Sequence, residues 1–476
     1  MKYFADIHCH PTLKAYGHSF PGKENSKNLK SKSSVWYYDP PNMIEKLVDL
    51  LGGLVKYRQS SMSANGFGNA GIVFASLYPM ERGFFDNKLG TGEFSDLLLN
   101  FVTSVGRDRI NFVQSVTDYF PDLENEYNYL KQLDGQLITL ADRADYHYKL
   151  ARNATDVNNT LNSDGNGDQK SNAISVILTI EGAHSFGTGI HPKEKPADRN
   201  YVLGNVEKVK NWEHRPIFIT LAHHFFNEFC GHAESLTGKV KAAVDQSYML
   251  NTGFTPLGLE VVDRLLDDSG NKRILIDIKH MSRTSRLEYF NLLNTKYAGH
   301  DIPVVVSHGA VIGGEADRQL FMNSDINLYD DEIIKVAKTD GLFGLQLDER
   351  RIAAHGDFQL KKTHSIERRK VLFYSSYLVW RQMQHIAELL DSQGLFAWGI
   401  QSIGSDYDGM IDTINGFWTA ENFPSLEDYL LMHAYNYMSC DGKNLKNSFN
   451  KIDPEEIVDR MMGDNAYNFV MKYYKN

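Results

Sequence analysis

Hydrophobic and polar positions follow one another along the chain in a pattern that predicts strands and helices in turn. Short apolar runs rich in Val, Ile and Phe are typical of strands buried in a parallel sheet. Eight such runs lie at residues 3–8, 71–77, 175–181, 216–223, 273–280, 303–308, 342–347 and 399–406.

Amphipathic segments lie between these runs, and their apolar residues recur at the three- and four-residue spacing that predicts helices. They are residues 44–57, 257–266, 285–297, 331–338 and 371–390. Asp453, followed by a proline and two glutamates, predicts the start of a closing helix. Eight alternations of strand and helix favour an α/β protein with a closed (β/α)8 TIM barrel over an open sheet.

The longest interval between predicted strands separates the second run from the third. We expect residues 84–174 to form an insertion in a single barrel domain that spans residues 1–476. Within it, residues 153–172 contain many turn formers and almost nothing to bury, so we expect a polar surface loop there.

The composition is that of a globular protein and narrows the classes of partner. Of the 476 residues, 42% are hydrophobic and 23% are charged, and the net charge of −10 disfavours nucleic acid as a partner. Three well-separated cysteines suggest neither a disulfide framework nor a thiolate zinc cage. No run resembles a signal-peptide core or a spanning helix, so we expect a cytoplasmic protein with no membrane partner.

Side chains suited to metal binding stand where several of the predicted strands end. His8 and His10 lie two residues apart in D-I-H-C-H-P, so both point to one face of a strand while Cys9 points to the other. Such a pair can grip one ion, or it can be two ordinary polar residues at a strand end. In a barrel enzyme the carboxyl ends of the strands form the active site, which favours the first interpretation.

Other strand ends supply further candidates. Glu181 ends the third run, and a carboxylate there must lie at the mouth, in a salt bridge or on a metal. His280 and His308 end the fifth and sixth runs, and either His223 or His224, expected on opposite faces, could reach the mouth from the fourth.

The eighth run ends with two acids, and the pattern favours a metal site beside them. Asp406 is suited to carry a proton from a water molecule to a leaving amine, and Asp408 has the same parity. Histidine and carboxylate ligands without thiolate favour zinc or a similar divalent ion. Five ligands are too many for one catalytic zinc, so two ions bridged by a carboxylate and a hydroxide fit better.

Taken in order, the motifs resemble those of the membrane (renal) dipeptidase family within the amidohydrolase superfamily. They are D-I-H-C-H-P, I-E-G-A-H-S, T-L-A-H, I-D-I-K-H-M-S, V-V-S-H-G-A and I-G-S-D-Y-D-G, together with T-P-L-G-L-E-V-V from Thr255 and G-D-N-A-Y-N-F-V from Gly463. The resemblance spans nearly the whole chain apart from the expected insertion.

This resemblance implies a binuclear zinc barrel hydrolase that cleaves the amide bond of dipeptides. By position, His8 and His10 would hold one ion, His280 and His308 the other, and Glu181 would bridge them. It also implies that Asp406 is the proton shuttle and that His223 faces the substrate and donates to the oxyanion.

Two positions depart from the family pattern. His10 stands where the family usually has aspartate, and Ile326 stands where the family has an arginine that clamps the substrate carboxylate. Isoleucine cannot replace that clamp, so either a neighbour such as Arg318 takes its place or the substrate lacks a carboxylate there. Lys279 is expected to face away from the barrel, and His184 to support the site or a turn.

The leading hypothesis is therefore a metal-dependent dipeptidase acting on a small-molecule substrate, a dipeptide or an N-acyl amino acid, with a homodimer as a candidate assembly. One alternative is a barrel metallohydrolase for other amide, lactone or phosphoester substrates. A second is a barrel that binds metal without catalysis.

Overall fold

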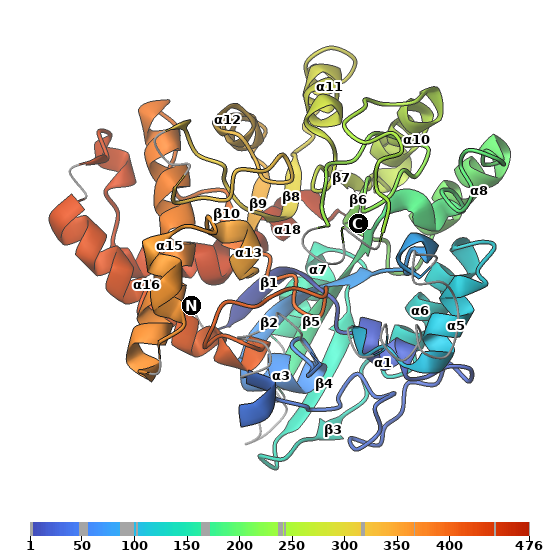
Figure 1. Ribbon diagram of the computed structural model, residues 1–476, viewed down its shortest axis with the longest axis horizontal. Helices are drawn as coiled ribbons and strands as arrows, with labels where there is room; N and C mark the ends of the chain where they lie inside the picture. Colours follow the sequence, from blue (N-terminus) through green and yellow to red (C-terminus); the bar gives the residue numbers. More distant parts are fainter. Residues whose placement is uncertain are drawn as a thin grey trace.

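The computed structural model of the chain describes residues 3–46, 56–85, 100, 103–162, 172–236, 241, 244–315, 319–365, 367–441 and 444–475. Its centre is a closed barrel of eight parallel strands (Figure 1). They are β1 (Phe4–Cys9), β2 (Ala70–Leu77), β5 (Asn172–Glu181), β6 (Phe218–Thr220), β7 (Leu275–Asp277), β8 (Val305–Gly309), β9 (Leu342–Leu345) and β10 (Gln401–Ile403).

The strands pair in chain order, and the barrel closes where β10 pairs with β1, with Asp6 opposite Ile403. Each of the eight predicted runs overlaps one of these strands, so the predicted TIM barrel is confirmed. Several strands stop earlier than the pattern predicts. For example, β6 ends at Thr220 and β10 at Ile403, so the polar side chains that follow lie on loops at the barrel mouth.

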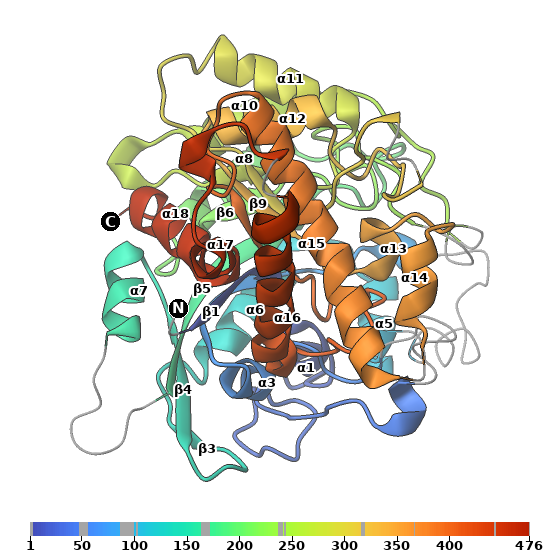
Figure 2. The same ribbon diagram turned by 90° about the vertical axis from the view of Figure 1, so that its left-hand side faces the viewer.

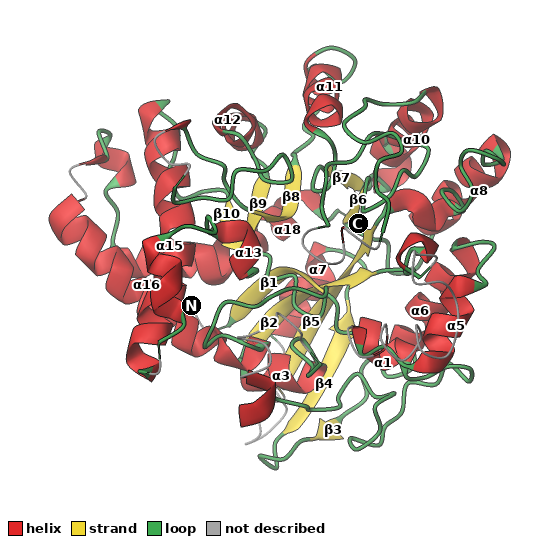
Figure 3. Ribbon diagram, in the orientation of Figure 1, coloured by secondary structure: helices red, strands yellow, loops and turns green. Residues whose placement is uncertain are grey.

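Helices surround the strands (Figure 3). Their amphipathic faces cover the barrel, whose own strands are buried along nearly their full lengths. The helices are α1 (Leu13–Gly17), α3 (Met62–Phe67), α5 (Arg107–Gln114), α6 (Phe120–Lys131), α7 (Ala154–Leu161), α8 (Arg199–Lys210), α10 (Pro256–Leu266), α11 (Arg283–Asn294), α12 (Asp330–Lys338), α13 (Glu349–Ile352), α14 (Phe358–Thr363), α15 (Arg368–Ser392), α16 (Phe423–Asn436), α17 (Pro454–Asp459) and α18 (Asn465–Tyr473).

Helices α10, α11, α12 and α15 confirm four of the five predicted amphipathic segments, and most of the fifth, 44–57, lies outside the described residues. The closing helix α17 begins as expected, because the Asp453 side chain accepts a hydrogen bond from the backbone N–H of Glu455. Figure 2 shows the long α15 beside α16, which together cover one side of the barrel.

The segment between β2 and β5 carries secondary structure that the sequence pattern did not predict. Strand β4 (Asp145–Leu150) runs parallel to the first half of β5, and the short β3 (Ile138–Thr139) pairs antiparallel with β4. Along one edge of β5, the first half therefore pairs with β4, which lies outside the barrel, and the end pairs with the barrel strand β6.

The expectation of a polar loop over 153–172 was wrong for its first part. Helix α7 occupies Ala154–Leu161, because the Asn153 side chain caps its first turn and Val157 is fully buried. The Asn153 cap and the buried Val157 side chain stabilise a helix here, although the segment is rich in residues that favour turns. Residues 163–171 lie outside the described residues.

Within the described part of the chain, no helix is both long and apolar enough to cross a membrane.

A buried ion pair fixes the helices that follow β2 against the start of the chain. The two terminal guanidinium nitrogens of Arg109 on α5 donate to the two oxygens of Asp122 on α6, each at 2.7 Å. The Tyr16 hydroxyl on α1 donates to the same carboxylate at 2.9 Å. Both charged side chains are almost fully buried, so each depends on the other for its charge balance.

Replacing Arg109 with alanine is expected to lower the free energy of unfolding by about 3–5 kcal/mol, because the Asp122 carboxylate would stay buried without its countercharge. Chemical denaturation followed by circular dichroism measures the change. The matched control is Arg107→Ala, an exposed residue on the same helix, for which we expect little effect. Equal effects of the two substitutions would contradict the assigned role of the pair.

Candidate functional site

The end of β1 directs two imidazoles into the barrel mouth. His8 and His10 are almost completely buried, and their rings lie edge to face with centroids 5.0 Å apart. His10 Nδ1 donates to the carbonyl of Ser76 at 3.1 Å, which leaves Nε2 facing the centre of the mouth. Cys9 points the other way, where its Sγ approaches the carbonyl of Phe74, as the strand alternation predicts.

Glu181, the last residue of β5, lies at the centre of a ring of imidazoles. Its two oxygens lie 3.1 to 3.7 Å from the Nε2 atoms of five histidines. These are His8, His10, His223, His280 and His308. Burial alone would raise the pKa of this carboxyl, but His223, His8 and His10 outweigh burial and hold it well below its usual range.

His280 and His308 form the other side of this ring. Their Nε2 atoms face each other at 3.1 Å, and His308 Nδ1 lies 2.7 Å from the Ser307 hydroxyl. Burial, assisted by neighbouring histidines, lowers the pKa of both imidazoles well below the usual value. Both rings are thus held neutral, the form in which histidine binds metals.

The residues at this site fit divalent cations. Glu181 belongs to two groups of residues, and within each group the ligand atoms lie within 4.8 Å of one another. The first group also contains His8 and His10, and the second also contains His280 and His308. His8 Nδ1 and Nε2, His10 Nε2 and His280 Nδ1 are buried without a hydrogen-bond partner among the described groups. Buried polar atoms are rarely left without a hydrogen-bond partner, and coordination of a metal ion would satisfy those nitrogen atoms that face the barrel mouth. Imidazole and carboxylate donors suit zinc and similar ions.

Asp406 lies beside the first of these groups, on the loop that follows β10. Its Oδ1 atom lies 3.8 Å from His8 Nε2 and 3.6 Å from His10 Nε2. Its Oδ2 atom accepts a hydrogen bond of 2.7 Å from the Gln346 side chain. Gln346, which follows β9, was missed by sequence reasoning because a lone glutamine after a strand carries no distinctive signal.

Asp408 serves a different purpose from Asp406. Its carboxylate accepts hydrogen bonds from the backbone N–H groups of Gln59 and Ser60 and from the Ser60 hydroxyl, and it lies 3.0 Å from the Lys14 ammonium. These contacts hold the 59–60 segment against the loop after β10. The Asp408 carboxylate therefore binds these groups and not the histidines around Glu181, although Asp408 has the same strand parity as Asp406.

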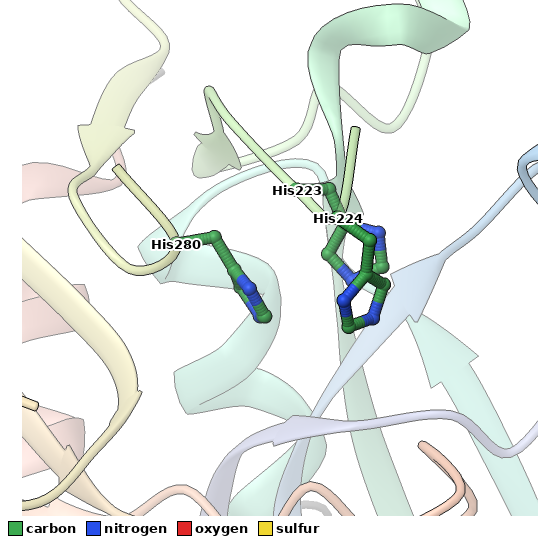
Figure 4. A group of neighbouring side chains, drawn as sticks. All are labelled: His223, His224 and His280. Atoms are coloured by element: carbon green, nitrogen blue, oxygen red, sulfur yellow. The ribbon is translucent and has the colours of Figure 1, made fainter. Parts of the chain in front are cut away.

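Three imidazoles gather where β6 and β7 end, as Figure 4 shows for His223, His224 and His280. The expectation that His223 and His224 face opposite ways was wrong, since their ring centroids lie only 3.9 Å apart. Strand alternation no longer applies after β6 ends at Thr220. His224 Nδ1 lies 2.6 Å from the Ser235 hydroxyl, whereas His223 reaches Glu181 through Nε2.

Glu81 is a second residue that sequence reasoning missed. It is almost fully buried, and its Oε2 atom accepts a hydrogen bond of 2.6 Å from His223 Nδ1. Burial disfavours the charged form of both side chains, but neighbouring charges outweigh it. His223 and His184 lower the pKa of Glu81 to about 2, and Glu181 and Glu81 raise the pKa of His223 to about 9. The only sequence signal was an acid four residues beyond the end of β2.

His184 also lies in this wall of the mouth, where its Nε2 donates to the carbonyl of Pro79 at 2.7 Å. It therefore fixes the loop after β2, which carries Glu81, instead of joining the groups around Glu181. A cavity of about 270 Å³ adjoins both residues and is also bordered by Tyr119 and Phe225.

Lys279 does not face away from the barrel as expected. It is 2% exposed, and the carboxylate of Asp406 is among the charges that act on it. The reason is local: β7 ends at Asp277, and His280 adopts a left-handed backbone conformation with φ of 65°, so neighbouring side chains no longer point to opposite faces. Ile326 is buried, and Arg318 lies outside the described residues.

A family model described as membrane dipeptidase (peptidase family M19) matches residues 120–452, more than half of the chain. No curated protein matches the chain significantly.

Two solved structures share the fold. One is described as dipeptidase AC, a metallopeptidase of family M19. It has 14% sequence identity, covers 90% of this chain and 96% of its own, and has a TM-score of 0.50. The other is a metallopeptidase from Rhodobacter sphaeroides liganded with a phosphinate mimic of the dipeptide L-Ala-D-Ala. It has 14% identity, covers 99% of both chains, and has a TM-score of 0.52.

The fit to cations predicts that zinc stabilises the protein. After treatment with a chelator, adding zinc should raise the Tm, because binding at a hundredfold excess over Kd stabilises a fold by about 2.7 kcal/mol. His308→Ala should reduce both the rise and the metal content, whereas the exposed His300→Ala should change neither. An unchanged Tm with zinc, manganese and cobalt alike would contradict the metal site.

Proposed function

The chain belongs to the membrane dipeptidase family, peptidase family M19, and on that premise we propose that it is a binuclear metal-dependent hydrolase that cleaves the amide bond of a dipeptide or an N-acyl amino acid. The observation that carries the proposal is the convergence of two ligand groups on one carboxylate, Glu181. Residues from four different strand ends meet there, at the face where barrel enzymes perform their chemistry.

In this proposal His8 and His10 would hold one ion, His280 and His308 would hold the other, and Glu181 would be available to both. When bound, the ions would supply Lewis acidity, which polarises the substrate carbonyl and makes a water molecule nucleophilic at neutral pH. Zinc is the proposed metal, because the donors are imidazoles and a carboxylate without a thiolate.

Asp406 is the proposed proton carrier. Gln346 donates a hydrogen bond to its Oδ2 atom. Its Oδ1 atom faces the histidines around Glu181 and lies within 4 Å of the Nε2 atoms of His8 and His10. From this position the carboxylate can take a proton from the attacking water and give it to the leaving amine. Gln346 would keep the carboxylate in one orientation throughout.

His223 is the proposed donor to the developing oxyanion. Its raised pKa favours the imidazolium, which donates through Nδ1 to Glu81 and can donate through Nε2 toward the reacting carbonyl. Such a bond strengthens as negative charge builds on that oxygen, so it lowers the barrier more than it tightens substrate binding. Glu81 is a positioning residue, because it acts on the reaction through His223.

The proposal predicts zinc-, manganese- or cobalt-dependent hydrolysis of dipeptides, measured with a dipeptide panel. Asp406→Asn should lower kcat by about 10² or more and leave the metal content unchanged, because a general acid-base group is lost. Asp428→Asn, which removes an exposed acid on α16, should match the wild type.

Three outcomes would contradict it. Turnover of a lactone or phosphoester in place of every peptide would favour a different barrel hydrolase. Tight metal binding without any turnover would favour a binding protein, and full activity of Asp406→Asn would remove that residue from the proposed role.

Glu81→Gln tests the assigned role of His223. Losing the carboxylate should lower the pKa of His223 by on the order of one unit. Because His223 works in its protonated form, activity is lost as pH rises through that pKa, and the variant should lose it at lower pH. The pH profile of kcat measures this shift, and the exposed Glu367→Gln serves as control. A reduced kcat with an unshifted profile would mean that Glu81 has a purely structural role.

A further inference from the structure

Two basic side chains lie at the barrel mouth with buried donors unused: Lys279 is buried and Arg351 is partly buried. Lys279, just after β7, is 2% exposed, and its Nζ atom has no hydrogen-bond partner in the part of the chain that is described. Arg351, on α13 just after β9, likewise has a buried Nη1 atom without a partner among those residues. Buried donors are normally paired, so the free donors on these two basic side chains favour an anionic partner.

Arg351 is held in place by its other end. Its Nη2 atom donates to the carbonyl of Ser235, and the hydroxyl of Ser235 lies 2.6 Å from His224 Nδ1. The guanidinium is thereby fixed across the mouth toward the histidines that follow β6. Through Ser235 it is linked to His224, whose ring centroid lies 3.9 Å from that of His223, and its charge acts on Lys279, His224 and Asp406.

The nearby acids are already occupied. Asp348 forms two hydrogen bonds with Arg350, of 3.0 and 2.8 Å. Asp277 accepts hydrogen bonds from the Thr220 hydroxyl and from two backbone N–H groups. Asp406 is held by Gln346 and faces the histidines of β1. No carboxylate of the described chain is therefore dedicated to Lys279 and Arg351.

We propose that Lys279 and Arg351 form the subsite that receives the free α-carboxylate of the substrate. This inference rests on the proposed function. In a dipeptide the α-carboxylate lies two bonds from the scissile nitrogen, so its subsite must lie directly beside the reacting groups. Lys279 meets that condition, because it immediately precedes His280 and is under the influence of Asp406. The guanidinium fork suits a planar carboxylate, and the ammonium adds a second charge.

A matched pair of substrates tests the subsite directly. The probes are L-Ala-L-Ala and L-Ala-L-alaninamide, which share the scissile bond and differ in the terminal charge. The wild type should favour the free acid by about tenfold or more in kcat/KM, because charge-assisted hydrogen bonds are the strong ones.

Arg351→Met and Lys279→Met should each reduce this preference by about tenfold, mainly through a larger rise of KM for the acid than for the amide. Arg351→Lys should keep part of the preference, since it keeps the charge and loses the fork. The control for the loss of one positive charge is Arg369→Met, an exposed residue at the start of α15. Metal content and Tm are measured for every variant.

A binding measurement answers the same question without turnover. The probes are the methyleneamine isostere of Ala-Ala, which has no amide to cleave, and its terminal carboxamide. Calorimetry with the metal-loaded wild type should show tighter binding of the carboxylate form by about tenfold or more, and Arg351→Met should remove most of the difference. This comparison stands even if one of the variants fails to fold, because the wild type alone must discriminate.

The outcomes separate the subsite from the function it rests on. If the wild type cleaves no peptide or amide, the proposed function fails. If it cleaves both probes equally, or if Arg351→Met and Lys279→Met keep the full preference for the acid, the function stands and the subsite is overturned. Equal losses on both probes in the variants would also overturn it, because a structural defect would not distinguish a carboxylate from an amide.

Discussion

The site depends on one buried negative charge. The Glu181 carboxylate is 3% exposed and would be costly to ionise in that environment without compensation. Five imidazoles supply the compensation, and they come from the ends of β1, β6, β7 and β8. The barrel thus brings the strand ends together, and the histidines at four of them stabilise the charge of the central carboxylate.

The loops at the mouth achieve this convergence through unusual backbone conformations. His280, Asp406 and Asp408 all have positive φ, between 61° and 68°, although none is glycine. Such conformations cost energy and persist where the surroundings fix them, as at functional sites. At His280 and Asp406 they turn side chains toward the mouth that the strand alternation would send elsewhere. Lys279 precedes His280 and was misplaced for this reason, whereas His223 and His224 were misplaced because β6 ends at Thr220.

The sequence predicted the barrel and its set of histidines and acids well, because both follow from local signals. Each strand is a short apolar run, and His8, Glu181, His280 and His308 each stand at the end of one. Glu81, Gln346 and Arg351 could not be found this way, since their importance comes from contacts with residues far away in the chain. The pairing of β4 with β5 was missed because β4 reads as a mixed polar segment, D-Y-H-Y-K-L.

The closure of the barrel between β1 and β10 also fixes when the site can exist. His8 and His10 stand at the end of β1, the first strand of the ring, whereas their neighbour Asp406 follows β10, the last one. These imidazoles are therefore synthesised before all the other strands of the ring. The complete centre can assemble only once β10 is available to pair with β1.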